Sequence, residues 1–283
     1  MSGGVSGEGG GGGGAPSPVR LVATDLDGTL VRRDGSVSAR TVAALDACRR
    51  AGVDVVAVTG RPPRWLADLA DVVGRATAIC ANGAIVYDIA RRRVVEARVL
   101  APDDVLAAVA AVRAAVPGTT AAVETLQGFR REPDYRPRHH AGDDRVAAPL
   151  PQLLADDPGV VKLLLRCEGV PSDRALALAE EALCGLAEPT HSGLGGLVEV
   201  SARGVSKAAT LARLATQRGV DAAEVAAFGD MPNDLAMLAW AGHSYAVADG
   251  HPDVLAAASA VAPPCEEDGV AQVLERLVLA RCR

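Results

Sequence analysis

The chain has 283 residues and a formal net charge of −6, with 49% hydrophobic but only 2% aromatic residues. This length allows one large domain or two modest ones, with a core built mainly from Ala, Val and Leu. The acidic balance argues against a nucleic-acid partner, and no run reaches the roughly 18 apolar residues of a membrane helix. The six cysteines form no C-x-x-C pair, which favours reduced thiols and a cytoplasmic protein.

The beginning of the chain is rich in glycine and contains no apolar run. We therefore expect a disordered tail over residues 1–18. Beyond it, short apolar runs alternate with helical segments, which predicts a parallel sheet covered by helices on both faces. The expected strands lie at residues 19–23, 53–58 and 76–81, and the expected helices at 38–51 and 65–73.

The pattern changes between residues 85 and 201. Strands are expected at 94–100, 119–124, 160–167 and 197–201, helices at 102–116 and 172–187, and an irregular polar stretch at 128–144. The alternation then resumes, with helices at 206–218, 232–241, 252–259 and 268–280 and strands at 225–228 and 244–247. The sequence thus predicts a doubly wound α/β core from residues 19–84 and 202–283, with an α+β domain of residues 85–201 inserted into it.

Polar side chains follow the predicted strands of the core. Asp25 and Asp27 come after the first strand, Thr59 after the second, and Asp230 and Asp234 after a later one. Ligands of open parallel sheets bind outside the carboxyl ends of the strands, so we expect these residues to converge although they lie far apart in the chain.

Four carboxylates in one crevice require cations. Two like charges 4 Å apart repel by roughly 4 kcal/mol at an effective dielectric constant near 20. A phosphate group would add to this repulsion, and Mg²⁺ is the usual oxygen-bound cation beside phosphates. Lys207 at a helix start supplies a further positive charge, together with the partial charge of the helix N-terminus.

Four segments in order resemble the four motifs of the haloacid dehalogenase superfamily. They are DLDGTL at residues 25–30, TGR at 59–61, GVSK at 204–207 and GDMPND at 229–234. The long insert between the second and third motifs is similar to the cap of the Cof-like, type-IIB branch. One such motif is weak evidence, whereas four at the right spacing over residues 19–280 are specific.

The resemblance implies a role for each motif residue. Asp25 would be the nucleophile that takes the phosphoryl group, and Asp27 would protonate the leaving oxygen and then deprotonate water. Asp234 would orient water or Lys207 beside the metal. The phosphate would be held by Thr59, Gly60, Lys207 and Asn233, and Mg²⁺ by Asp25, the backbone carbonyl of Asp27, and Asp230.

The sequence also departs from the family pattern. Ala208 stands where the family often has glycine, and residues 248–251, Ala-Asp-Gly-His, replace a usual Gly-Asn-Ala stretch. In the cap we expect the polar stretch 124–140 to face the crevice, where Arg130, Arg131 and Tyr135 would contact the substrate. The alternative is that these arginines are solvated surface charges.

The predicted function is a magnesium-dependent phosphatase acting on a small phosphorylated metabolite such as a sugar phosphate. A phosphomutase of the same superfamily and a non-catalytic phosphometabolite-binding regulator are the alternatives. The paired Asp25 and Asp27 disfavour a pure binder, which needs no acid beside a nucleophile. We expect no nucleic-acid or membrane partner, and the sequence leaves the substrate and the oligomeric state open.

Overall fold

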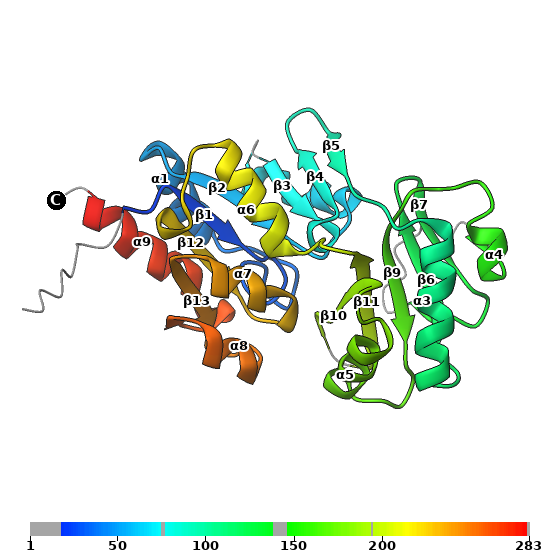
Figure 1. Cartoon of the computed structure of the whole chain (residues 1–283). Helices are drawn as coiled ribbons and strands as arrows, with labels where there is room; N and C mark the ends of the chain where they lie inside the picture. Colours follow the sequence, from blue (N-terminus) through cyan, green and yellow to red (C-terminus); the bar gives the residue numbers. More distant parts are fainter. Residues whose placement is uncertain (1–17, 75–76, 138–145, 194, 282–283) are drawn as a thin grey trace, which may run out of the picture.

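Two β-sheets, each with its own helices, build the molecule (Figure 1). The computed structural model describes residues 18–74, 77–137, 146–193 and 195–281. The predicted tail of residues 1–18 therefore lies almost wholly outside the described residues. Within the described ranges, no helix has the length and apolarity needed to cross a membrane.

The large sheet has eight strands in the order β14-β13-β12-β1-β2-β3-β4-β5. Its first six strands are parallel, whereas β4 and β5 run antiparallel to their neighbours. The strands are β1 (Leu21–Thr24), β2 (Asp54–Val58), β3 (Thr77–Cys80), β4 (Ile85–Asp88), β5 (Arg93–Ala97), β12 (Val225–Gly229), β13 (His243–Val247) and β14 (Ala260–Ala262).

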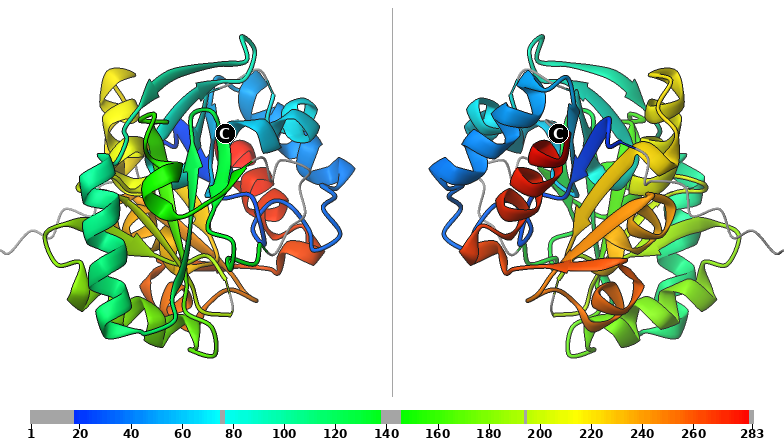
Figure 2. Two further views of the ribbon diagram at one scale, coloured as in Figure 1. Left: turned by 90° about the vertical axis from the view of Figure 1, so that its right-hand side faces the viewer. Right: turned by 90° about the vertical axis from the view of Figure 1, so that its left-hand side faces the viewer.

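Helices cover both faces of this sheet, as Figure 2 shows with α9 in red and α6 in yellow on opposite sides. Val22 of β1 belongs to the core shared with α1 and α9, whereas its neighbours Leu21 and Ala23 pack toward α6, α7 and α8. This alternation follows from the two-residue period of a strand. The helices are α1 (Ala39–Arg50), α2 (Ala70–Val73), α6 (Lys207–Gln217), α7 (Leu235–Trp240), α8 (Pro252–Ala257) and α9 (Gly269–Arg281).

The smaller sheet has the order β10-β11-β9-β6-β7-β8 and is antiparallel except between β7 and β8. Helices α3 (Pro102–Ala115), α4 (Leu150–Leu153) and α5 (Ser172–Ala182) share one apolar core with one face of the sheet. The strands are β6 (Thr120–Thr125), β7 (Gly128–Arg131), β8 (Val146–Ala147), β9 (Val160–Arg166), β10 (Ala187–Thr190) and β11 (Leu197–Ala202).

The predicted boundary of the insert at residue 85 is wrong. Strands β4 and β5 extend the large sheet, so the chain leaves this sheet only after Ala97 and returns to it after Ala202. We call the unit between them the cap, since it lies beside the carboxyl edge of the large sheet. The apolar pattern of a short strand does not say which sheet the strand joins, so the sequence did not assign β4 and β5 to the large sheet.

Several local predictions hold and others fail for identifiable reasons. Ser38 and Ser206 cap α1 and α6, each hydroxyl accepting a hydrogen bond from the backbone N–H three residues later. The helix expected at residues 65–73 is present as a 3₁₀ helix, Pro63–Leu69, followed by α2. Strands β7, β10 and β14 were not expected, because their short, polar or alanine-rich sequences carry little strand pattern and are held by pairing to longer neighbours.

Candidate active site

The carboxyl ends of β1, β2 and β12 meet at one point of the large sheet. Parallel pairing sets Leu21 level with both Asp54 and Val225, so these three strands end at the same edge. The structure thereby brings Asp25 and Asp230 together across 205 positions of sequence, as the strand-end pattern predicted.

Lys207 is the buried cation of the site. It begins α6 directly after the capping Ser206, and its side chain is fully buried. Its Nζ donates to Asp25 Oδ1 at 2.5 Å and to Asp234 Oδ1 at 2.7 Å. Burial alone would lower the pKa of this amine, but the two carboxylates outweigh burial and raise the pKa, so Lys207 stays charged.

Negative charge exceeds positive charge around Lys207. Burial, with Asp234 and Asp230 nearby, raises the pKa of Asp25 well above its usual value despite the attraction of Lys207. Burial and the charge of Asp234 raise the pKa of Asp230 to about 7. Three carboxylates that surround one ammonium group form a site with room for a divalent cation, which would stabilise the ionised forms.

Oxygen donors for such a cation come from Asp25 and Asp230. Together with Asp234 they place carboxylate oxygens within 4.8 Å of one another. Asp234 is already engaged, because Oδ1 accepts from Lys207 and Oδ2 accepts from the backbone N–H groups of Asp230 and Met231. Hard carboxylate oxygens of this kind fit Mg²⁺.

Asp27 stands at the rim of the same crevice with a half-exposed side chain. Arg61 donates to both of its carboxylate oxygens, at 2.5 and 2.8 Å, and so fixes its orientation. Gly28 turns the chain after it with φ +82°, and a Cβ there would lie 2.4 Å from Asp230 Oδ2. Only glycine therefore lets the loop approach the carboxylates so closely.

The predicted phosphate-binding residues surround these acids. Thr59 is fully buried, and its hydroxyl accepts from the backbone N–H of Arg61. Gly60 and Asn233 line the wall of the crevice beside Asp25 and Asp27. The roles in phosphate binding remain predictions, whereas the proximity of the residues is observed.

A cavity of about 320 Å³ opens from Asp25 and Asp27 to the sheet of the cap. Besides the Arg61–Asp27 pair, two ion pairs lie in its wall: Lys162 Nζ is 2.5 Å from Glu199 Oε1, and Arg64 pairs with Glu124. Lys162 also donates to the backbone carbonyl of Gly60 at 2.8 Å, which joins the cap to the loop after β2. The aromatic side chains in the wall are Trp65, Phe129 and Tyr135.

Two of the three predicted cap residues do not reach this cavity. Arg130 pairs through two nitrogens with Asp156, and Arg131 donates to backbone carbonyls including that of Tyr135, so neither lines the cavity wall. Tyr135 does line it and is 3% exposed. The expectation for the arginines failed because the unexpected strand β7 aims Arg130 away from the crevice.

The sequence did carry an unused signal for the missed residues. Lys162 and Glu199 are charged residues inside otherwise apolar strands, and both are almost fully buried. A charge in a buried strand needs a partner and commonly marks a functional position. Asn82, at the end of β3, links Glu199 to the core by donating to its Oε2 at 3.2 Å.

Comparison with known proteins agrees with this geometry. The family model of haloacid dehalogenase-like hydrolases matches residues 22–274, nearly the whole chain. The chain belongs to the haloacid dehalogenase-like hydrolases. This membership confirms the resemblance drawn from the four motifs and the prediction of a hydrolase of the phosphatase type.

Relatives of this hydrolase cover it almost end to end. It is 27% identical to the phosphatase YwpJ of Bacillus subtilis, in an alignment that covers 92% of this chain and 100% of that protein. It is also 27% identical to the 5-amino-6-(5-phospho-D-ribitylamino)uracil phosphatase YitU of the same organism, over 90% of this chain and 96% of that protein. The fold matches the structure of a subclass IIB sugar phosphatase with a TM-score of 0.72 at 21% identity, over 91% of this chain and 98% of that one.

Proposed function

We propose that this hydrolase is a magnesium-dependent phosphatase that transfers the phosphoryl group of a small metabolite to Asp25 and then to water. The observation that carries the proposal is the buried contact of Asp25 with Lys207 at the floor of a cavity whose rim holds Asp27. A carboxylate beside a fixed cation and a second carboxylate within reach of the leaving group are the parts that covalent phosphoryl transfer requires.

The first half of the reaction forms a bond from Asp25 Oδ to phosphorus and breaks the bond from phosphorus to the leaving oxygen. The proton of Asp27 passes to that oxygen, so the leaving group departs as an alcohol. In the second half Asp27 takes a proton from water, and the water oxygen attacks phosphorus and frees Asp25. Inorganic phosphate is the second product, and Asp27 ends protonated as it began.

Charge in the transferring group is stabilised by fixed groups of the chain. Lys207 is held by Asp25 and Asp234 and would contact phosphate oxygens together with Thr59, Gly60 and Asn233. A magnesium ion held by Asp25, Asp230 and the backbone carbonyl of Asp27 would neutralise charge on the phosphate. Preorganised groups of this kind need no rearrangement when charge develops in the transition state.

The cavity wall suits a polyhydroxylated leaving group. Lys162, Glu199, Ser192 and Glu124 offer donors and acceptors for hydroxyl groups, and Trp65 offers a flat apolar surface for a carbon skeleton or ring. The subclass IIB sugar phosphatase and YitU are named for substrates that share one feature, a phosphate on a hydroxylated carbon chain or ring. We infer that this hydrolase acts on a phosphate ester of the same chemical class.

Release of inorganic phosphate tests the proposal. Purified protein with Mg²⁺ is offered a panel of phosphorylated sugars, polyols and ribityl compounds, and Asp25→Asn protein serves as the control. We expect release from some hydroxylated phosphate esters and none from the variant. Equal release by both proteins, or turnover only when a bisphosphate activator is added, would contradict the proposal, and the second result would indicate a phosphomutase.

A further inference from the structure

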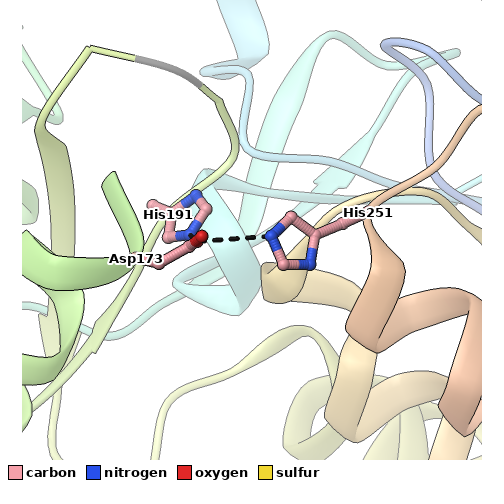
Figure 3. A group of neighbouring side chains, drawn as sticks. All are labelled: Asp173, His191 and His251. Carbon is pink, nitrogen blue, oxygen red and sulfur yellow. Dashed lines mark hydrogen bonds and ion pairs between the residues drawn. The ribbon is translucent and has the colours of Figure 1, made fainter. Parts of the chain in front are cut away.

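Two histidines and one aspartate meet where the cap touches the core (Figure 3), and none of the three lines the cavity at Asp25. Asp173 lies in the first turn of α5, His191 directly after β10, and His251 directly before α8. His251 is the last residue of segment 248–251, where the sequence departs from the usual pattern of its family. The catalytic scheme gives none of these three side chains a task.

The donor atoms of this triad are spaced like the ligands of one metal ion. Asp173 Oδ1 lies 2.9 Å from His191 Nε2 and 3.3 Å from His251 Nε2. Metal–ligand bonds of about 2.0–2.1 Å at tetrahedral angles place neighbouring donor atoms roughly 3.3 Å apart. One donor atom from each of the three residues falls within 4.8 Å of the others, so only a small approach of the two imidazoles would complete three corners of a coordination shell.

The donor types select a transition metal. Imidazole nitrogen with one carboxylate suits zinc, cobalt or nickel, whereas magnesium prefers oxygen ligands alone. The side chain of Asp173 is 71% exposed, which leaves one side of the triad open to a water ligand, whereas His191 is 2% exposed. The triad therefore differs in chemistry from the all-carboxylate site around Asp25 and Asp230.

We propose that Asp173, His191 and His251 bind one divalent transition-metal ion of the zinc type, which ties the cap to the core. Binding needs both Nε2 atoms without protons, so each neutral imidazole carries its proton on Nδ1 instead. In the structure His251 Nδ1 accepts from the backbone N–H of Asp253 at 3.3 Å and lies 3.8 Å from Asp253 Oδ2. Metal binding would replace that hydrogen bond with one from Nδ1–H to the carboxylate, a partner of the kind that orients metal-bound histidines. The Nδ1 of His191 is buried without a hydrogen-bond partner among the described residues, and this cost limits the affinity.

The position of the triad gives the bound metal a consequence for turnover. The backbone carbonyl of His191 accepts from Asn233 N–H at 3.3 Å, and the backbone N–H of His251 donates to the carbonyl of Asp230 at 2.7 Å. A metal ion that fixes both histidines would hold the cap in its observed position against the crevice. Substrate entry and product release need the cap to move, so the metal should slow the proposed phosphatase reaction.

Direct metal binding tests the site without any activity measurement. Metal-free full-length protein is titrated with Zn²⁺ by calorimetry, and with Co²⁺ by visible absorption, in excess Mg²⁺ to occupy the carboxylate site. We expect the wild type to bind one equivalent more than His251→Ala and Asp173→Asn, which change side chains that are 17% and 71% exposed. His243→Ala, which removes an imidazole elsewhere in the core, should keep the extra equivalent.

The same proteins give a second reading that depends on the proposed function. With Mg²⁺ saturating, Zn²⁺ should inhibit phosphate release by the wild type at concentrations at least tenfold lower than for His251→Ala. The binding titration decides the proposal whether or not the protein releases phosphate. Equal binding of Zn²⁺ by wild type, His251→Ala and Asp173→Asn would overturn the metal site and leave a hydrogen-bonded contact between cap and core.

Discussion

The two walls of the cavity are built by different means. The core wall consists of residues that directly follow parallel strands, so Asp25, Thr59 and Asp230 are delivered by backbone alone. The cap wall consists of single charged residues on an antiparallel sheet, where Lys162 pairs with Glu199 on the neighbouring strand and also donates to the backbone carbonyl of Gly60 in the core. The comparison teaches that the proposed catalytic residues lie in short local motifs, whereas the cap wall of the cavity is assembled from isolated side chains.

Removal of the nucleophile should have the largest effect and would test the core wall. Asp25→Asn keeps the shape of the side chain but removes the attacking anion, so kcat should fall by roughly four orders of magnitude or more. The melting temperature should stay the same or rise, because the variant no longer buries a carboxylate whose pKa is raised by burial. Steady-state phosphate release and thermal unfolding measure these two results, and substantial turnover by the variant would refute attack by Asp25.

Removal of the divalent cation should have the second-largest effect. An excess of chelator should lower phosphate release by roughly 100-fold or more, since a cation at a phosphoryl oxygen contributes several kcal/mol in the transition state. Added Mg²⁺ in excess of the chelator should restore the rate. Asp230→Asn protein should need a higher Mg²⁺ concentration for half-maximal rate. Undiminished turnover in the chelator would show that Lys207 alone balances the charge.

Exchange of a cap ion pair would show whether the cap wall selects the substrate. The double variant Lys162→Met with Glu199→Met removes both charges together, so no buried charge is left without a partner. We expect kcat/KM for the best hydroxylated substrate to fall roughly 10- to 100-fold, from lost charge-assisted hydrogen bonds. Hydrolysis of p-nitrophenyl phosphate, which lacks hydroxyl groups, should change far less.

The matched control lies in the same cap. Arg130→Met with Asp156→Met also removes one cation–carboxylate pair, but that pair does not line the cavity. We expect its kcat/KM to stay near the wild-type value for both substrates. Equal losses on both substrates in the Lys162 and Glu199 variant would mean that this pair supports folding or cap position and does not contact the leaving group.

The acid sensitivity of Glu199 should be the smallest effect. Burial raises the pKa of this carboxyl, but Lys162 and hydrogen bonds from Ser192 and Asn82 outweigh burial and lower it below the ordinary 4.5. A carboxyl whose folded-state pKa is lowered stabilises the fold above the unfolded pKa and loses this contribution as pH falls through the folded value. The stability difference between wild type and Glu199→Gln should therefore be constant near neutral pH and narrow below about pH 4.5.

Urea unfolding at a series of pH values measures that difference. Arg130→Met with Asp156→Met again serves as a comparison, because its carboxylate is exposed. A difference that stays constant down to pH 3 would mean that the Lys162–Glu199 pair contributes no net stability in the folded protein.

The sequence by itself determined the parallel α/β class of the core, the order of the motifs along the chain and the core wall of the site. Apolar runs that end in Asp25, Thr59 and Asp230 suffice for this, because parallel strands must deliver their carboxyl ends to one edge. The resemblance of the four motifs then predicted the family, and the match over residues 22–274 confirmed it.

Only the tertiary structure decided the edge strands of the large sheet and the side chains that the cap brings to the core. Strands β4 and β5 joined the large sheet and β7 turned Arg130 away from the cavity, because pairing with neighbours distant in the chain overrode weak local patterns. The pairing of Lys162 with Glu199 and the meeting of Asp173, His191 and His251 likewise depend on how the cap rests on the core. No periodicity along the chain encodes such contacts. Each of these sites takes single side chains from segments that are distant in the sequence, and only the folded chain brings them together.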